Sequence, residues 1–476
     1  MGSFTFGYSI AVINSPETIV ENFINETVIQ RTGVPILASH LRSYWSLIVA
    51  IFAIGGMIGG LSAGAWADFF GRKKGMLLNN AIGIAGSMLI GFSKMGSSFE
   101  MIIVGRVILG FNCGLTTCLT PMYLSEIAPA NIRGALGVVH QLAITIGILM
   151  SQIFGFQEIL GTKSLWPVLL GLPLAPCIIQ LLMLPLCPES PRFLLITKHQ
   201  ETEARAALVT LRGKFDVDLD IEDMKSEQRM CQAEPKISIA QLIVKSSLRK
   251  QLVIGIVMQI SQQSCGILAI LYYSHSLFVS AGMLPNVATH AVSGIGAVMV
   301  VMTFISIPLM EYVGRRTLHL TGLMGMFVLS IVMTLALTLN GTVKGMQTVG
   351  AITVIFYVAA FSIGPGSIPW LIVAELFPQG SRAPAMSICT MINWLSNFIN
   401  GFTFPYVQKG LDDLSFVPFT ILLLLFWGFT YMYLPETKDK TIEQITDMFR
   451  QQQQEKQSKT DGVAKENSYL VGFKKM

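Results

Sequence analysis

Three glutamines, Gln259, Gln262 and Gln263, stand in one long apolar segment. Residues spaced i, i+3 and i+4 lie on one face of a helix, so we expect their amides to point the same way. An amide both donates and accepts hydrogen bonds, which suits an uncharged ring compound that carries hydroxyls. Similar residues in two further apolar segments are His140, Gln141, Asn393, Trp394 and Asn397. The pattern predicts a polar binding site inside an apolar protein, although such amides also hold helices together.

The stretch 362–370, Ser-Ile-Gly-Pro-Gly-Ser-Ile-Pro-Trp, interrupts another apolar segment. Proline removes a backbone donor and glycine exposes the backbone, so Gly364, Pro365 and Gly366 would disrupt a plain helix. In lipid, such backbone is tolerated only where protein or a water-filled cavity satisfies it. We therefore expect a hinge beside a solute path, with Trp370 closing one end of the cavity. A kinked helix at a packing contact is the alternative.

Composition places these segments in a membrane. Hydrophobic residues make up 52% of the chain and charged residues 13%, against roughly 25% charged residues in soluble domains. A soluble enzyme is therefore excluded, and the net charge of +5 is not a nucleic-acid signature because the bases cluster in a few loops. We expect an all-α membrane protein with about twelve spans. The expected spans are 1–13, 44–67, 76–94, 100–120, 135–157, 165–187, 249–275, 287–310, 318–338, 347–370, 384–408 and 415–434.

The first of these segments is short, because thirteen helical residues reach only about 20 Å across roughly 30 Å of hydrocarbon. We therefore expect the natural protein to have more residues before Met1, and no signal peptide is recognisable. The seven cysteines have no CxxC spacing, so neither metal nor any other cofactor is expected.

Charge and glycosylation signals agree on orientation. Asn25-Glu26-Thr27 and Asn340-Gly341-Thr342 are acceptor sequences in two loops on the same side of the membrane, which predicts a glycoprotein. Basic residues gather on the other side, which the positive-inside rule makes cytoplasmic. With twelve spans, both termini are expected in the cytoplasm. The basic loop residues are Arg72, Lys73, Lys74, Arg133, Arg315, Arg316 and Arg382.

The chain repeats itself in two halves. We expect a six-span half over 1–187, a cytoplasmic helical linker over 188–248, a second six-span half over 249–434, and a mostly disordered cytoplasmic tail over 435–476. Three motifs recur in the same order at nearly one spacing, which indicates duplication. The paired motifs are Gly71-Arg72-Lys73 with Gly314-Arg315-Arg316, Glu126 and Arg133 with Glu375 and Arg382, and Pro188-Glu189-Ser190 with Pro435-Glu436-Thr437. Parallel six-span repeats around a midplane cavity are typical of rocker-type carriers.

These motifs, with Asp68 before Gly71, Pro191-Arg192, Gly364-Pro365-Gly366 and Pro369-Trp370, resemble the facilitative glucose transporter branch of the sugar porters, within the major facilitator superfamily. The resemblance covers essentially the whole chain. It implies twelve spans in two six-helix halves plus intracellular helices, and uniport of a hexose, glucose before others, across the plasma membrane. The residues that match the family's sugar-contacting positions are Gln141, Gln262, Gln263, Trp370 and Asn393.

Four positions depart from the family's glucose pattern. Leu268 and Met299 replace asparagines, Ser362 replaces a glutamate, and Leu271 stands where an aromatic faces the sugar. Each lost hydrogen bond removes about 0.5–1.5 kcal/mol, enough to redirect binding. Fructose, urate, another polar solute, or a non-transporting sugar sensor are therefore kept as alternatives. The expected partners are a small sugar and the lipid bilayer, with no nucleic acid; the sequence identifies no protein partner.

The charged residues at the inner ends of spans are expected to be mechanical, because ion pairs there could clamp the halves together while the cavity faces outward. Ordinary positive-inside topology is the alternative. Tyr272 and Tyr273 are expected at an outer gate, with a lipid-interface belt as the alternative. The expected gating or conformational residues are Asp68, Arg72, Glu126, Arg133, Glu189, Arg192, Tyr272, Tyr273, Glu311, Arg315, Gly364, Pro365, Gly366, Glu375 and Arg382.

The sequence contains few motifs that would indicate energy coupling or catalysis. No Walker-type phosphate loop is present, so ATP-driven transport is not expected. Ser9 stands where proton-linked relatives place an aspartate, and no intramembrane carboxylate replaces it, which favours passive uniport. Zinc-protease and serine-hydrolase motifs are also absent from the sequence, so the chain is not expected to be an enzyme.

Overall fold

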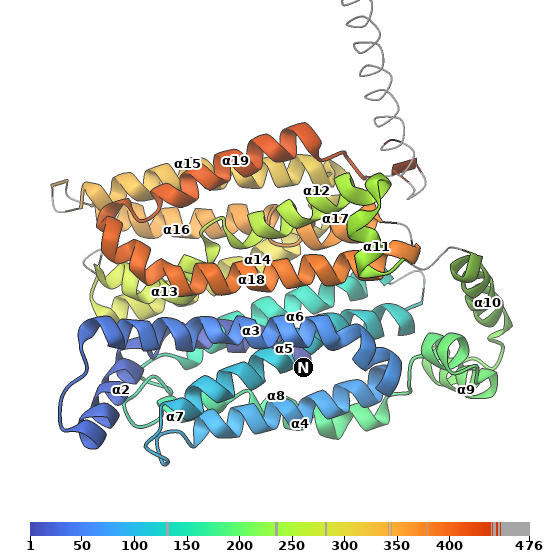
Figure 1. Cartoon of the computed structure of the whole chain (residues 1–476), viewed down its shortest axis with the longest axis horizontal. Helices are drawn as coiled ribbons and strands as arrows, with labels where there is room; N and C mark the ends of the chain where they lie inside the picture. The colour runs from blue at the N-terminus through green and yellow to red at the C-terminus, as the bar shows by residue number, and fades with distance from the viewer. Residues whose placement is uncertain are drawn as a thin grey trace, which may run out of the picture.

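The computed structural model describes residues 1–129, 133–233, 237–280, 283–340, 342–343, 345–377, 379–438, 440, 444–445 and 448. Regular structure in these ranges is helical, and most helices run along the long axis of the molecule (Figure 1). The helices of the first half are α1 Gly2–Ala11, η1 Val12–Asn14, α2 Glu17–Thr32, α3 Ala38–Phe70, α4 Arg72–Gly91, α5 Glu100–Ile127, α6 Arg133–Phe154, α7 Trp166–Gly171, α8 Leu174–Met183 and η3 Leu184–Leu186.

The remaining helices form a linker and a second half. The linker holds η4 Phe193–Thr197, α9 Glu201–Arg212, α10 Asp218–Ala233 and α11 Ile239–Val244. The second half holds α12 Ser246–Gln263, α13 Ile267–Ser280, α14 Pro285–Val313, α15 Arg315–Thr338, α16 Met346–Ile363, α17 Ile368–Leu376, α18 Gln379–Leu411, η5 Asp412–Leu414 and α19 Val417–Tyr433. We call the end of the bundle where α9 to α11 lie the linker end, and the other the opposite end (Figure 1).

Seven helical segments in the described ranges are long and apolar enough to cross a membrane, or eight if 380–414 and 417–433, bent by 99°, count as one span. The other expected spans, including α1, α4 and α6, are shorter or less apolar, yet they lie in the same bundle (Figure 1). Three of the seven spans contain a break: 166–186 breaks between α7 and α8, 248–275 between α12 and α13, and 346–376 between α16 and α17. The expected break at 364–367 is therefore present.

Glycine lets the helices of the first half approach closely. A Cβ placed on Gly55 would lie 2.1 Å from the carbonyl oxygen of Val107, and one on Gly110 would lie 2.0 Å from that of Phe52. Neither position admits a side chain, so α3 and α5 touch backbone to backbone. Small residues serve this purpose in membranes because van der Waals packing, not water exclusion, drives helix association there.

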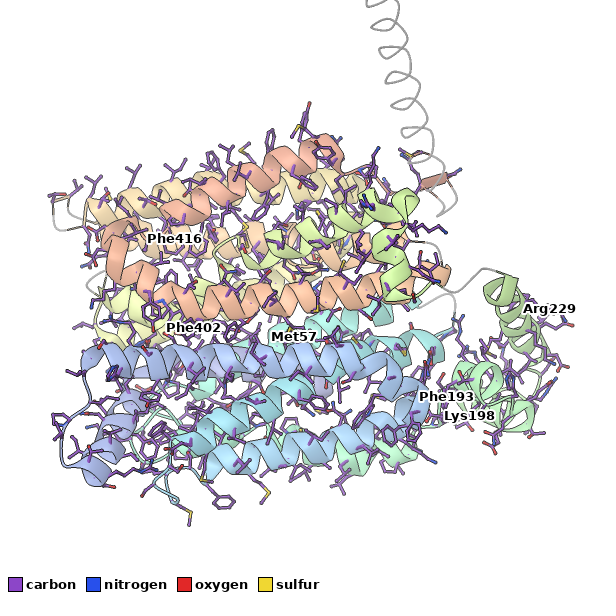
Figure 2. All side chains as sticks on the ribbon, viewed as in Figure 1. Met57, Phe193, Lys198, Arg229, Phe402 and Phe416 are labelled. Carbon is purple, nitrogen blue, oxygen red and sulfur yellow. The ribbon has the colours of Figure 1, made fainter. Side chains whose placement is uncertain are left out.

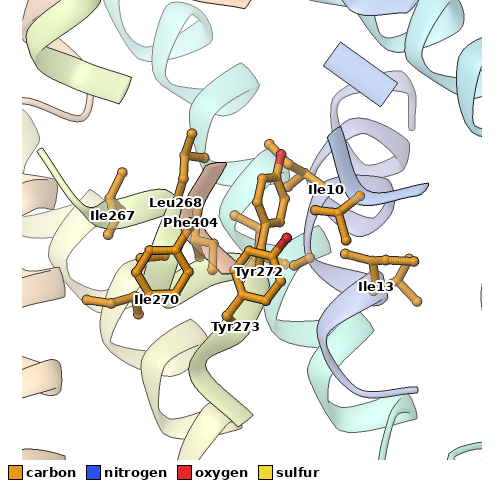
Figure 3. Packing of buried hydrophobic residues seen from close by; sticks show 14 of the residues in the cluster. Ile10, Ile13, Ile267, Leu268, Ile270, Tyr272, Tyr273 and Phe404 are labelled. Atoms are coloured by element: carbon orange, nitrogen blue, oxygen red, sulfur yellow. The ribbon is translucent and has the colours of Figure 1, made fainter. Parts of the chain in front are cut away.

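The two halves meet mainly along two pairs of helices, α3 with α18 and α6 with α14, and α13 also contacts α1 and η1. The largest apolar cluster spans the junction and includes residues of α1, η1 and α13 (Figure 3). Ile10 and Ile13 come from the first half, and Leu268, Tyr272 and Tyr273 come from the second. The core therefore continues from one half to the other.

The linker folds into short amphipathic helices, as its sequence predicts. In α9 the buried residues Ala204, Ala207 and Leu208 lie on one face and pack with Ile221 of α10. Phe193 and Lys198 lie beside this pair at the linker end (Figure 2), with the Lys198 ammonium 5.6 Å from the centre of the Phe193 ring. The last linker positions, 246–248, already belong to α12. Most of the tail, 435–476, lies outside the described residues.

Candidate functional site

The three glutamines of α12 share one face and meet Asn393 of α18. The Asn393 amide nitrogen donates to Oε1 of Gln259 and Oε1 of Gln262, both at 2.7 Å. The Gln263 amide nitrogen donates to Asn393 Oδ1 at 2.9 Å, and Asn397 donates back to Gln263 Oε1 at 3.3 Å. The structure thus brings together five of the polar residues expected at the site, and these amides also join α12 to α18.

The amide network reaches the break between α16 and α17. Gln262 Nε2 donates to the carbonyl oxygen of Gly366 at 2.5 Å. The Tyr357 hydroxyl of α16 donates to the carbonyl oxygen of Cys265, at the break between α12 and α13. Gly266 there has a φ of +86°, which favours glycine. Each broken span therefore supplies a group that satisfies the broken backbone of the other.

A cavity with about 260 Å³ of atom-free space lies next to this network. Gln141 and Thr145 of α6 line it from the first half, and residues of α14, α16 and the break line it from the second. Its lining residues are Gln141, Thr145, Met299, Thr303, Ser306, Phe361, Ser362, Gly366 and Ser367. The lining is uncharged and rich in hydroxyls, and Gly366 belongs both to it and to the amide network.

The residues expected to contact the sugar do not all lie in the same place. Gln141 lines the cavity, whereas Gln262, Gln263 and Asn393 form the neighbouring amide network. Trp370 is the third residue of α17, half-buried, and is not among the described residues that line the cavity. Its role in closing the cavity therefore stays a prediction.

The four positions that depart from the family's glucose pattern also lie in two different places. Met299 and Ser362 line the cavity, so two of the changes act on its wall. Leu268 and Leu271 instead belong to the apolar cluster on α13, where Leu268 is 3% exposed (Figure 3). At position 268 the chain therefore has a core residue, which offers a bound solute no polar contact.

Sequence reasoning missed the hydroxyls of the cavity. Thr145, Thr303, Ser306 and Ser367 come from three separate stretches, each too ordinary to stand out. A weak signal was present in Met299, Thr303 and Ser306, since spacings of four and three put them on one face of α14.

Tyr272 and Tyr273 are buried, which contradicts the alternative of a lipid-interface belt. Tyr272 donates to Asn397 Oδ1 at 3.0 Å, and Tyr273 donates to the Gly401 carbonyl oxygen at 2.9 Å. Next to them, Asn14 of the first half donates to Ser274 Oγ at 2.7 Å and accepts from the backbone N–H of His275 at 3.2 Å. Asn14, which the sequence did not single out, therefore joins the halves toward the opposite end.

The ion pairs at the linker end lie within the halves. Arg72 binds both oxygens of Glu126 from Nε, at 3.1 and 3.0 Å, and Oε1 from Nη2 at 2.9 Å. In the second half, Arg315 lies 3.3 Å from Glu375. Asp68 approaches Arg72 only to 3.7 Å and is largely exposed. In this conformation these pairs tie helices of one half together, and a clamp between halves stays a prediction for the other conformation.

A carboxylate caps the helix after each repeated Gly-Arg motif. Glu189 accepts the backbone N–H groups of Arg72 and Lys73, at 3.2 and 2.9 Å. Glu436 accepts those of Arg315 and Arg316, at 2.9 and 3.1 Å. These are the free donors at the starts of α4 and α15, where negative charge is favoured.

The structure describes the remaining charged residues expected to act in gating in less detail. Arg382 donates from Nε to the Phe377 carbonyl oxygen at 3.3 Å, inside its own half. Arg192 immediately precedes η4. The side chains of Arg133 and Glu311 lie outside the described part of the chain.

Arg106 of α5 is a buried cation that sequence reasoning did not single out. It is 2% exposed and donates to the carbonyl oxygens of Ser9 at 2.7 Å and of Ile48 and Val49 at 3.2 Å. Its guanidinium lies 4.4 Å from the centre of the Phe52 ring. Carbonyl dipoles and a ring face thus stabilise the charge, and they bind α5 to α1 and α3.

The chain is similar to known proteins along nearly all of its length. The family model described as "Sugar (and other) transporter" matches residues 1–449. The chain is 46% identical over 451 residues to "Solute carrier family 2, facilitated glucose transporter member 1" of Gallus gallus, covering 95% of this chain and 92% of that protein. It is 44% identical over 469 residues to facilitated glucose transporter member 3 of Homo sapiens, covering 98% and 94%.

Solved structures give the same result. The inward open conformation of the xylose transporter XylE from E. coli matches with a TM-score of 0.78 and 25% identity, over 94% of this chain and 97% of that one. Its partially occluded inward open conformation matches with a TM-score of 0.76 and 25% identity, over 92% and 97%. The expected fold of the major facilitator superfamily is therefore confirmed.

Proposed function

The chain belongs to the sugar (and other) transporter family, which consists of multi-pass membrane carriers rather than enzymes, and on this premise we propose that it carries a hexose, with glucose first, by facilitated uniport. The observation that carries the proposal is the uncharged cavity between the halves, lined by hydroxyls and the Gln141 amide. Such groups can exchange hydrogen bonds with the hydroxyls of a neutral sugar.

The lining also ranks the alternative substrates. Urate is an anion at neutral pH, and a buried anion needs a cation or several donors. No charged side chain is among the described residues that line the cavity, so urate is disfavoured and fructose remains the second candidate. A sugar sensor would use the same pocket without net flux.

Uncoupled transport agrees with the surroundings of Arg106. Its hydrogen-bond partners are backbone carbonyls, including that of Ser9, and the Ser9 side chain is a hydroxyl rather than a carboxylate that could take up and release a proton. A proton gradient is therefore expected to leave uptake unchanged.

The direction of opening follows from contacts at the opposite end. Asn14 binds Ser274, and Ser43 of α3 and Tyr406 of α18 share a hydrogen bond of 2.9 Å. We take this end as the exterior of a plasma-membrane carrier, with both termini and the linker between the two six-span halves in the cytoplasm. The described conformation is then closed to the outside.

The test is uptake of radiolabelled glucose and fructose into liposomes that contain the chain, with and without an imposed proton gradient. We expect saturable uptake of one hexose, independent of the gradient, and its loss in Gln262→Ala, which removes a central amide. The matched control is Gln347→Ala, because Gln347 is exposed near the start of α16. Binding without flux would indicate a sensor, and folded protein that neither binds nor transports hexoses would refute the proposal.

A further inference from the structure

Ser367 stands at the N-cap of α17, inside the break, and does not act as a cap. A serine there usually accepts a backbone N–H from the second or third helical residue, yet no such bond is made. The second helical residue is Pro369, which has no N–H to offer. The Ser367 hydroxyl oxygen is buried and has no hydrogen-bond partner within the described chain. Its hydrogen-bonding capacity is unused.

The other hydroxyls of the cavity wall differ from Ser367 in one respect. Thr145 donates to the Leu142 carbonyl oxygen, Thr303 to that of Met299, and Ser306 to that of Thr303, at 2.7 to 3.0 Å. Ser362 donates to the Val358 carbonyl oxygen at 2.9 Å. These hydroxyl hydrogens are committed to the helix that carries them, so the groups face the cavity as acceptors.

The wall is therefore asymmetric. Most of it accepts hydrogen bonds, and Ser367 together with the Gln141 amide supplies the donors that remain free. A sugar hydroxyl can serve both kinds of wall, because it donates one hydrogen and accepts through two lone pairs. An orphan hydroxyl in a buried site is costly unless a ligand satisfies it.

We infer that Ser367 is a specificity-determining residue that donates its hydroxyl hydrogen to one oxygen of the bound sugar. The inference rests on the proposed function and deepens it. It selects a neutral polyol whose hydroxyls donate toward Thr145, Thr303 and Ser306 while one oxygen accepts from Ser367. A sugar that lacks this oxygen loses the hydrogen bond from Ser367 at the break. It keeps its hydrogen bonds to the rest of the wall.

The test measures competition with uptake of the transported hexose by two sets of analogues, each lacking one hydroxyl or carrying fluorine in its place. One deoxy analogue should compete about two- to tenfold more weakly than the parent sugar. The fluoro analogue at the same carbon should lose less, because fluorine keeps an acceptor. In Ser367→Ala the parent sugar should weaken by the same two- to tenfold, and this deoxy analogue should no longer be weaker than the parent.

Matched variants separate a lost contact from lost structure. Ser367→Thr keeps the hydroxyl and should keep the discrimination, whereas Ser367→Cys, with its weak donor, should lose it. Ser87→Ala is the control, because Ser87 is a buried serine of α4 whose hydroxyl donates to Gly83 at 2.8 Å, far along the chain from the cavity residues.

The outcomes distinguish the two proposals. A wild-type protein that transports no hexose overturns the proposed function and this inference with it. Normal transport with unchanged competition in Ser367→Ala, or with an equal loss for every analogue, overturns the role of Ser367 alone.

Discussion

The indole of Trp394 lies directly on Gly56. A Cβ built on Gly56 would come within 2.6 to 2.7 Å of three ring atoms of Trp394, which also packs near Phe6 and Phe52, with ring centres 5.7 and 6.0 Å away. Trp394 belongs to the second half and its three neighbours to the first. A side chain of one half thus fills a space that only glycine leaves open in the other.

Gly56→Ala should weaken this contact. The new methyl group meets a large, closely packed ring rather than a flexible chain end, and overpacking of this kind costs about 1–3 kcal/mol. We expect a lower unfolding temperature and a shift toward conformations in which the halves are apart, measured by thermal denaturation and by labelling of introduced cysteines. Gly64→Ala is the control in the same helix, since nothing lies within 4 Å of its Cβ position. Equal behaviour of the two variants would contradict the prediction.

Gln152→Met should stabilise the described conformation. Gln152 is 1% exposed, both its amide atoms lack hydrogen-bond partners within the described residues, and its Oε1 lies 2.2 Å from a Cβ position on Gly296 of the other half. Removing an unsatisfied buried amide relieves about 1–3 kcal/mol. The variant is expected to melt higher and, because the closed junction is favoured, to transport more slowly. Gln347→Met changes an exposed glutamine and should do neither.

The pair Arg72 and Glu126 should show strong coupling in a double-mutant cycle. Both side chains are 11% exposed and share three hydrogen bonds, so about 1–3 kcal/mol is expected from stability measurements on Arg72→Gln, Glu126→Gln and the double variant. The exposed pair Arg205 and Glu201 is the comparison and should couple less. A cycle in which the exposed pair couples more strongly would argue against this ranking.

The linker should respond to acid. Lys225, which lies 2.7 Å from Glu201, and then Arg205, hold the pKa of the Glu201 carboxyl below its usual value of 4.5. A lowered pKa means that the folded linker gains stability above pH 4.5 and loses it as the pH falls through the folded-state value. Spin-label distances between α9 and α10 are expected to lengthen below that pH. Glu201→Gln should remove the pH dependence, and Glu203→Gln, an exposed neighbour on α9, should keep it.

Local patterns predicted much of this molecule. The spacing of Gln259, Gln262 and Gln263 implied one face, and the network with Asn393 confirms that they lie together. The break at 364–367 followed from backbone chemistry that holds in any surroundings. Such features depend on residues near one another in sequence.

Features built from distant residues could not be found in this way. The duplication placed Glu and Arg at the same end of the bundle, but only the three-dimensional arrangement shows that Arg72 pairs with Glu126 inside one half. Arg106 is satisfied by backbone carbonyls, which every residue has, so no residue type marked its partners. The place of Ser367 in a cavity wall depends on α6, α14 and α16, which are distant in the sequence and line the same cavity.

The two capping carboxylates, Glu189 and Glu436, have a consequence for how the molecule is divided. Each follows the last expected span of its half and binds the start of an earlier helix, α4 or α15, so the end of each half is attached to its own middle. Neither attachment passes through the polypeptide between the halves. We therefore expect a chain severed by a protease within 213–217, between α9 and α10, to stay assembled as two fragments, each closed on itself.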